Sequence, residues 1–182
     1  KREIQNWREN KDLPSPNGIL IMSGGSNVPE DSLLKAMKHI DASIPITLII
    51  GPFADKSILE RNLKRTGFIN YNIIKNPINL FHELKKARLV VMPFGVTTYE
   101  CLALGIPAYV YKIINPDDEK IVKYLANNDL LYNGLNTNSD AEVIGNLINN
   151  IFYNNAGLEK KSQNSLKYID AFGVKRVAKI IS

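Results

Sequence analysis

The stretch RLVVMPFGVTTYECLALGIP, residues 88–107, contains a strand, a loop and a helix in immediate succession. The run 88–93, apolar after Arg88, is short enough for a buried strand, and a glycine lies two residues beyond it. Residues 97–104 predict a helix that Gly105 ends, and the next mostly apolar run, 106–113, predicts another strand. Strands that alternate with helices in this way are typical of a parallel sheet.

The same alternation extends along the rest of the chain. The predicted strands are 18–23, 45–51, 69–74, 88–93, 106–113 and 130–134. The predicted helices are 29–40, 56–65, one that starts at Asn76 as N-cap with Pro77 at its first position, 97–104, 116–128, and two or three after Asp140. The pattern predicts a Rossmann-like, doubly wound α/β domain, a parallel sheet of about six strands in the order 3-2-1-4-5-6.

We expect the domain to occupy residues 18–182, with residues 1–17 as a linker or hinge helix. The charged start, KREIQNWREN, is not a signal peptide, and it contains no initiator Met. The sequence therefore predicts a piece of a longer protein whose N-terminal domain precedes this one.

Composition excludes several classes of protein. The net charge of +5 is too diffuse to indicate nucleic-acid binding, and no apolar run is long enough for a transmembrane helix. A single cysteine, Cys101, rules out an internal disulfide and favours a reducing compartment, so we predict a cytoplasmic protein. With His39 and His82 as the only histidines, a metal site of cysteines and histidines is not expected.

Two glycine loops indicate where a ligand binds. In the predicted order, the first and fourth strands are neighbours, and the crevice at their carboxyl ends is the usual ligand site. Glycine allows a ligand to approach the backbone, and helix N-termini favour anions. A phosphate or diphosphate is therefore expected between the loops, held by Gly24, Gly25 and Ser26 on one side and by Gly95, Val96, Thr97 and Thr98 on the other, the two threonines adding hydroxyl donors.

Glu100 is the only charged residue between Leu89 and Tyr111. A charge in an apolar segment costs free energy unless it is paired or hydrated. A carboxylate beside a diphosphate site can accept hydrogen bonds from the two hydroxyls of a ribose. Two structural roles for Glu100 remain open beside this one: an acid favoured by the helix dipole, and a capping box with Thr97.

Four motifs resemble those of a known family. They are GGSN, IIGP, GVTTYECLALGIP and DAFGVKRV, which match in order the C-terminal domain of GT-B-fold nucleotide-sugar enzymes. The sequence is most similar to the UDP-sugar hydrolase of pseudaminic acid biosynthesis and its spore-coat polysaccharide relatives. The most specific element is Thr-Thr-x-Glu followed by Gly-x-Pro.

The resemblance implies roles for individual residues. Glu100 would hold the ribose of a UDP-sugar, the two glycine loops would hold the diphosphate, and the base would lie near Ile74. The chain departs from the family at Asn27, in the Phe94–Val96 loop, and at Asp117–Glu119, where relatives often have a glutamine.

The resemblance implies the nucleotide-sugar-binding half of a UDP-sugar hydrolase in nonulosonic acid or surface polysaccharide synthesis. The alternatives are the donor-binding domain of a glycosyltransferase and a non-catalytic binding domain of the same fold. We predict no catalytic residue, cofactor or metal in this chain, and no activity for the chain alone. The resemblance places the hydrolytic histidine in the N-terminal domain.

The remaining candidate residues are expected to be structural. His82 is expected at the surface and Cys101 in the core. The first loop lacks the NAD fingerprint, and no P-loop motif is present.

Overall fold

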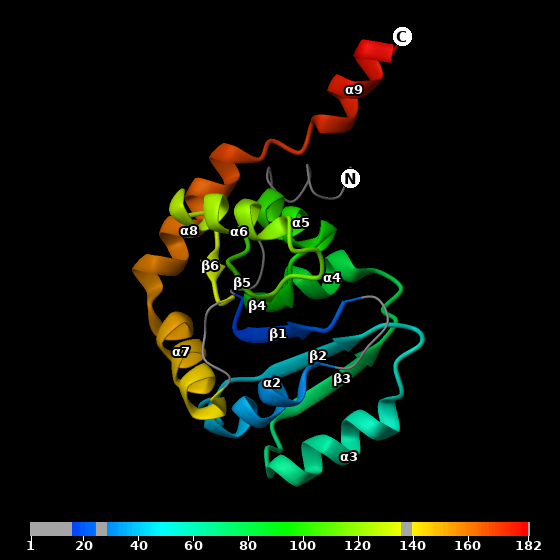
Figure 1. Cartoon of the computed structure of the whole chain (residues 1–182), viewed down its shortest axis with the longest axis vertical. Coiled ribbons are helices and arrows are strands. Elements are labelled where there is room, and N and C mark those ends of the chain that lie inside the picture. The colour runs from blue at the N-terminus through cyan, green and yellow to red at the C-terminus, as the bar shows by residue number, and fades with distance from the viewer. Residues whose placement is uncertain (1–15, 25–28, 136–139, 182) are drawn as a thin grey trace.

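The computed structural model describes residues 16–24, 29–135 and 140–181, and it contains one parallel sheet of six strands. The strands are β1 (Gly18–Met22), β2 (Ile46–Ile50), β3 (Tyr71–Lys75), β4 (Ala87–Pro93), β5 (Ala108–Lys112) and β6 (Tyr132–Asn133). Their order is β3-β2-β1-β4-β5-β6 (Figure 1), which confirms the predicted doubly wound α/β fold. Residues 1–15, most of the predicted linker, lie outside the described residues.

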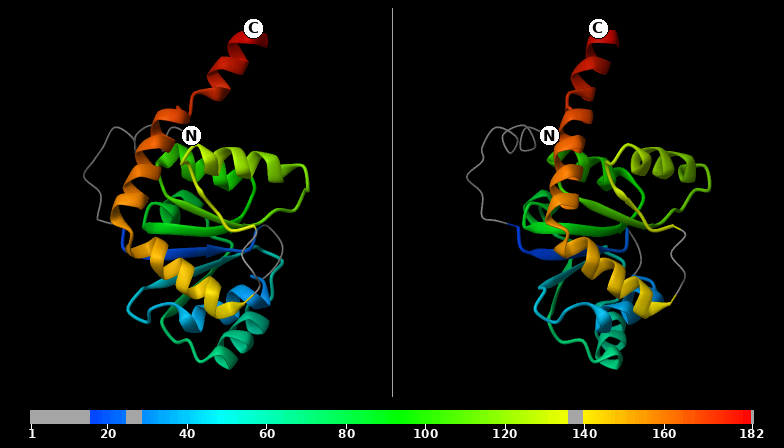
Figure 2. Two further views of the ribbon diagram at one scale, coloured as in Figure 1. Left: turned by 60° about the vertical axis from the view of Figure 1, so that its left-hand side comes forward. Right: turned by 90° about the vertical axis from the view of Figure 1, so that its left-hand side faces the viewer.

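Helices cover both faces of the sheet (Figures 1 and 2). They are α2 (Asp31–Ala36), η1 (Met37–His39, a 3-10 turn), α3 (Lys56–Thr66), α4 (Leu80–Leu84), α5 (Val96–Leu104), α6 (Asp118–Asn127), α7 (Ala141–Tyr153), α8 (Asn155–Tyr168) and α9 (Gly173–Ile181). Two apolar cores result. One lies between the sheet and α2, α3 and α7, and the other lies between the sheet and α4, α5 and α6. The central strands are buried on both faces, which is why their sequences are almost entirely apolar.

The helix predicted at Asn76 begins later, and this prediction was wrong. Asn76 has a left-handed backbone with φ of 48°, so it ends β3 instead of capping a helix. The N-cap of α4 is Asn79, whose side-chain oxygen accepts the backbone N–H of His82 at 3.3 Å. Asparagine suits both positions, because its short polar side chain tolerates left-handed backbone and also caps helices.

The helix predicted for residues 29–40 is shorter and tightens at its end. The α-helical part is α2, and η1 continues it as a single 3-10 turn. Its apolar residues at helical spacing are all buried: Leu33, Leu34, Met37 and Ile40. The segment therefore keeps one buried face although the helix type changes.

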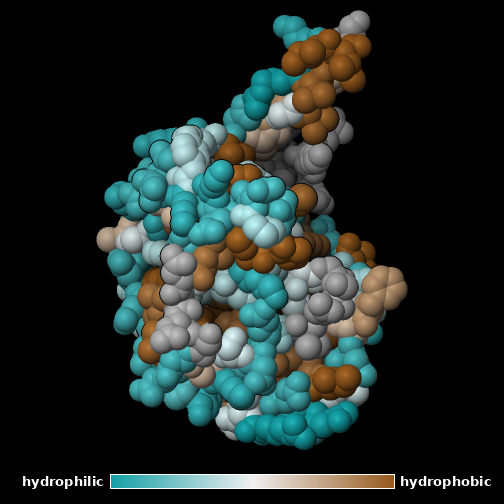
Figure 3. All heavy atoms as spheres, in the orientation of Figure 1, coloured by the Kyte–Doolittle hydropathy of each residue, from teal (hydrophilic) through white to brown (hydrophobic). Residues whose placement is uncertain are grey.

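The last helix, α9, stands away from the rest of the molecule (Figures 1 and 2). None of its described residues is buried, and its apolar side chains Val174, Val177, Ile180 and Ile181 are exposed. Figure 3 shows hydrophobic surface along the projecting helix. In the part of the chain that the structure describes, no helix has the length and apolar character needed to span a membrane.

Candidate functional site

The two predicted loops meet at the carboxyl edge of the sheet. Leu20 of β1 lies opposite Val90 of β4, so the loops that follow these strands leave the sheet side by side. Between them is a cavity of about 210 Å³, lined by Met22, Gly24, Met92, Pro93, Phe94, Gly95, Val96, Thr97 and Ile114. The structure thus brings together four of the predicted site residues: Gly24, Gly95, Val96 and Thr97.

The loop after β1 turns at Gly24. Its φ of +81° is a conformation that residues with a side chain rarely adopt, and a Cβ placed there would lie 3.6 Å from Cγ of Pro93. Glycine therefore allows the chain to turn beside the end of β4. Gly25 and Ser26, predicted to continue this side of the site, lie outside the described residues, as does Asn27.

The loop after β4 ends in a short capping arrangement. Gly95 is the N-cap of α5, and its backbone N–H donates to the hydroxyl of Thr98 at 3.2 Å. The N–H of Thr98 in turn donates to the carbonyl of Gly95 at 3.0 Å. These bonds fix the first turn of α5, so the helix N-terminus is held against the cavity.

Thr98 corrects one part of the sequence analysis. Its side chain is fully buried, and its hydroxyl donates to the Met92 sulfur at 3.6 Å as well as accepting from Gly95. The hydroxyl is thus occupied within the protein and is not an available donor for a ligand. The neighbouring Thr97 lines the cavity, and its side chain is the available one of the pair.

Neither structural role considered for Glu100 fits the structure. The capping box joins Gly95 and Thr98, not Thr97 and Glu100, and α5 has no acid in its first turn. Glu100 is partly exposed, and among the described residues its carboxylate has no hydrogen bond or ion pair. It lies beyond the lining of the cavity, one turn further along the same helix.

Cys101 is a core residue, as predicted. Its side chain is fully buried, and burial, with a smaller contribution from the charge of Glu100, raises the pKa of the thiol. A thiol with a raised pKa carries little thiolate, so it is a poor nucleophile.

Ile74 lies at the same edge of the sheet but outside the cavity. It sits opposite Ile49 near the end of β3, partly buried against the second core. The loop after it leaves the sheet through Asn76, whose N–H donates to the carbonyl of Ile50 at 2.9 Å. The role of Ile74 beside a base stays a prediction.

Two contacts at this edge were not predicted from the sequence. The Tyr111 hydroxyl donates to the carbonyl of Met22 at 3.3 Å, and burial raises the pKa of that hydroxyl. The ammonium of Lys112, at the end of β5, forms an ion pair with Glu30, the N-cap of α2. One sequence feature could have drawn attention to Lys112: it is the first charged residue after Glu100, at the end of an otherwise uncharged stretch.

Two of the three acids at the start of α6 interact favourably with the helix dipole, and the third does not cap the helix. Asp118 and Glu119 lie in the first turn, where the helix dipole favours negative charge. The N-cap Asp117 makes no side-chain capping bond, and its N–H instead donates to the side chain of Asn115 at 3.2 Å.

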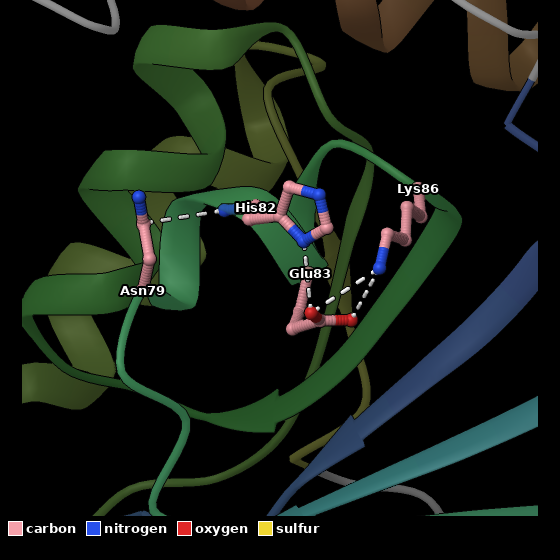
Figure 4. A network of polar contacts seen from close by, with 4 residues as sticks. All are labelled: Asn79, His82, Glu83 and Lys86. Atoms are coloured by element: carbon pink, nitrogen blue, oxygen red, sulfur yellow. Dashed lines mark hydrogen bonds and ion pairs between the residues drawn. The ribbon is translucent and has the colours of Figure 1, made fainter.

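A second polar cluster lies at the opposite edge (Figure 4). The Glu83 carboxylate contacts His82 Nδ1 at 3.0 Å and Lys86 Nζ at 3.0 Å. Partial burial opposes the charge of Glu83, but these contacts outweigh it and hold the pKa of its carboxyl below the ordinary value. The neighbouring cavity, about 160 Å³, includes Gly18 and Ala87 at the starts of β1 and β4. Ligands of doubly wound sheets bind at the carboxyl ends, so this is not the candidate site.

Several solved structures share this architecture. WaaG, a glycosyltransferase involved in lipopolysaccharide biosynthesis, matches 98% of this chain and 50% of its own, with a TM-score of 0.70 and 13% identity. Anabaena Alr3699/HepE in complex with UDP-glucose matches 93% of this chain and 48% of its own, with a TM-score of 0.68 and 13% identity. This chain has the fold of a GT-B Rossmann-like domain.

A third solved structure with this fold belongs to an enzyme whose activity differs from that of WaaG. A UDP-N-acetylglucosamine 2-epimerase matches 94% of this chain and 46% of its own, with a TM-score of 0.66 and 16% identity. The chain therefore spans about half the length of these solved structures.

Sequence comparison gives less information. No family model matches the chain. An uncharacterized protein of Methanocaldococcus jannaschii, MJ1062, is 31% identical over 115 residues, which cover 60% of this chain and 23% of that protein.

Proposed function

We propose that this chain is the UDP-sugar-binding domain of a GT-B glycosyltransferase. The observation that carries the proposal is the cavity between the two glycine loops, at the carboxyl ends of β1 and β4. This is where doubly wound sheets bind nucleotides. The solved complexes of HepE with UDP and with UDP-glucose support the choice of ligand, since they share the fold.

The diphosphate would lie between the loops. The N-terminus of α5 faces the cavity through Gly95, Val96 and Thr97, and the unpaired N–H groups of a first helical turn attract anions. The Thr97 side chain and the turn at Gly24 complete the described part of this surface. A diphosphate at this place would be held mostly by backbone groups.

Glu100 would accept hydrogen bonds from the ribose. Its carboxylate has no partner among the described residues, and it lies on the helix whose first turn lines the cavity. Two vicinal hydroxyls would supply the donors that the protein itself does not provide.

A UDP-sugar hydrolase of nonulosonic acid synthesis is the second candidate. Its support is the Thr-Thr-x-Glu motif of α5, which resembles that family. The shared fold with the glycosyltransferase WaaG favours the transferase instead, and for that reason we place it first. In either case the reacting group would come from the partner domain.

Calorimetric titration with UDP tests the binding site. Replacing Glu100 by glutamine keeps its size and removes the charged acceptor, so we expect a loss of about 1.5–3 kcal/mol, at least a tenfold weaker affinity. The matched control is Glu142→Gln, an exposed acid on α7, which should bind UDP like the wild type. Equal affinity of Glu100→Gln and wild type would remove Glu100 from the site.

UDP release separates the two activities. The full-length protein should release UDP from a UDP-sugar only with an added acceptor if it is a transferase, and with water alone if it is a hydrolase. The present chain should release none, because a positioned acid or base typically contributes about 10²–10⁴-fold to such a reaction and none is expected here. Turnover by this chain alone would contradict the assignment of the reacting group to the partner domain.

A further inference from the structure

We propose that Lys112 is a phosphate-binding residue of the candidate site and that Glu30 competes with the ligand for it. The proposal rests on the proposed function, since it assigns a counter-charge to the diphosphate of a UDP-sugar. It begins from the cavity itself, whose nine lining residues, all within the described part of the chain, carry no charged side chain. A helix N-terminus supplies only about half a positive charge, less than a diphosphate requires.

Lys112 is directly connected to the lining. It is opposite Pro93 in the sheet, and its carbonyl accepts the N–H of Phe94 at 2.7 Å. Ile114, two residues further on, lines the cavity with Pro93 and Phe94. The Lys112 backbone is therefore fixed against the cavity wall, and its side chain, about half exposed, extends from that fixed point.

Glu30 holds the ammonium in the absence of a ligand. It is the N-cap of α2 and follows the loop that begins at Gly24, yet its side chain makes no capping bond and pairs with Lys112 instead. The ion pair thus links the C-terminal end of the loop after β1 to the end of β5. An exposed ion pair of this kind contributes little to stability, so a diphosphate can readily replace Glu30 as the partner of Lys112.

Opposite effects of two substitutions distinguish this role from a structural one. If the ion pair only fastens the loop, removing either partner disrupts the same contact and changes UDP affinity in the same direction. If Lys112 binds phosphate, Lys112→Met weakens binding because a cation is lost. Glu30→Gln strengthens binding, because it releases Lys112 and removes a negative charge near the ligand.

The experiment is calorimetric titration of the chain with UDP at low and high salt. We expect Lys112→Met to lose about threefold to tenfold in affinity and Glu30→Gln to gain about twofold to fivefold, both differences shrinking at high salt. Lys35→Met is the matched control, because Lys35 forms an exposed ion pair with Asp31 at 2.6 Å on α2. It changes the net charge equally and should leave the affinity unchanged, and thermal melting should show all variants folded.

Each outcome decides one question. Wild-type affinity in Lys112→Met, or weaker binding in both Lys112→Met and Glu30→Gln, would overturn the inference while leaving UDP binding established. A wild-type chain that does not bind UDP would overturn the proposed function, and this inference with it.

Discussion

The hydroxyl of Thr98 lies between the backbone N–H of Gly95, from which it accepts at 3.2 Å, and the sulfur of Met92, to which it donates at 3.6 Å. This buried group joins the end of β4 to the first turn of α5. A threonine predicted to contact the ligand thus builds the loop instead, and its effect on binding passes through the position of Gly95.

Thr98→Val should destabilise the protein. Valine fills nearly the same volume but leaves the N–H of Gly95 without its acceptor, so we expect a loss of about 1–2 kcal/mol in the free energy of unfolding. Urea denaturation measures it. Thr97→Val is the control, since the Thr97 hydroxyl has no hydrogen-bond partner among the described residues. Equal stability of the two variants would show that the cap contributes nothing.

Gly95→Val should prevent UDP binding without unfolding the chain. The backbone of Gly95 is extended, and a Cβ there would meet no atom within 4 Å, so valine fits without a clash and adds bulk at a residue that lines the cavity. We expect at least a tenfold loss of affinity, and a cost of about 1 kcal/mol for valine at an N-cap.

The control for that experiment is Gly67→Asn. A Cβ at Gly67 would also meet no atom within 4 Å, but this glycine ends α3 in a left-handed conformation that asparagine tolerates. The variant should bind UDP normally. Normal binding by Gly95→Val would show that the ligand lies elsewhere.

Asp129 should make stability depend on pH. Hydrogen bonds from Lys160 and Lys161 lower the pKa of its carboxyl below the ordinary value of 3.8. Its contribution is therefore complete above pH 3.8 and is lost as the pH falls through the lowered pKa. Asp129→Asn keeps the left-handed backbone, φ of 56°, but removes the charge.

Thermal melting over a range of pH tests this. The Asp129→Asn variant should melt below the wild type at neutral pH, and the difference should shrink as the medium becomes more acidic than the ordinary aspartate pKa. A difference that does not change with pH would mean that the two lysines do not stabilise the carboxylate.

Removal of α9 should leave the fold intact. Since none of its described residues is buried, deletion of residues 173–182 should change the free energy of unfolding by about 0.5 kcal/mol or less. Leu158→Ala is the contrast, because Leu158 on α8 is 5% exposed and its truncation should cost about 2–4 kcal/mol. A large loss on deletion would show that α9 packs against the domain.

The central strands of the sheet were predictable because they are buried on both faces, unlike the partly exposed β3. Runs such as 89–93 are continuously apolar and end at proline or glycine, and such a pattern can be recognised without knowing which strands lie beside it. Local capping was less predictable. Asn76 and Asn79 are both suitable caps, and only the hydrogen bond to His82 shows which of them starts α4.

The candidate site was predictable where it depends on backbone, and less so where it depends on side-chain direction. Gly24 and Gly95 were found because glycine marks close approach. The inward direction of Thr98 depends on where α5 starts, and a shift of one residue changes which threonine faces the cavity. The pair of Glu30 and Lys112 joins residues 82 apart, which no local pattern indicates.

The pairing of β1 with β4 also has a consequence for the order of folding. Leu20 and Val90 are about 70 residues apart, whereas Leu48 of β2 and its partner Ile73 of β3 are about 25 apart. Closing the longer loop costs about 1 kcal/mol more in chain entropy, so the central pair is expected to form after the outer units. A nucleotide held by both glycine loops would then bridge β1 and β4, the last strands to pair. Its binding would slow the separation of the two halves of the sheet.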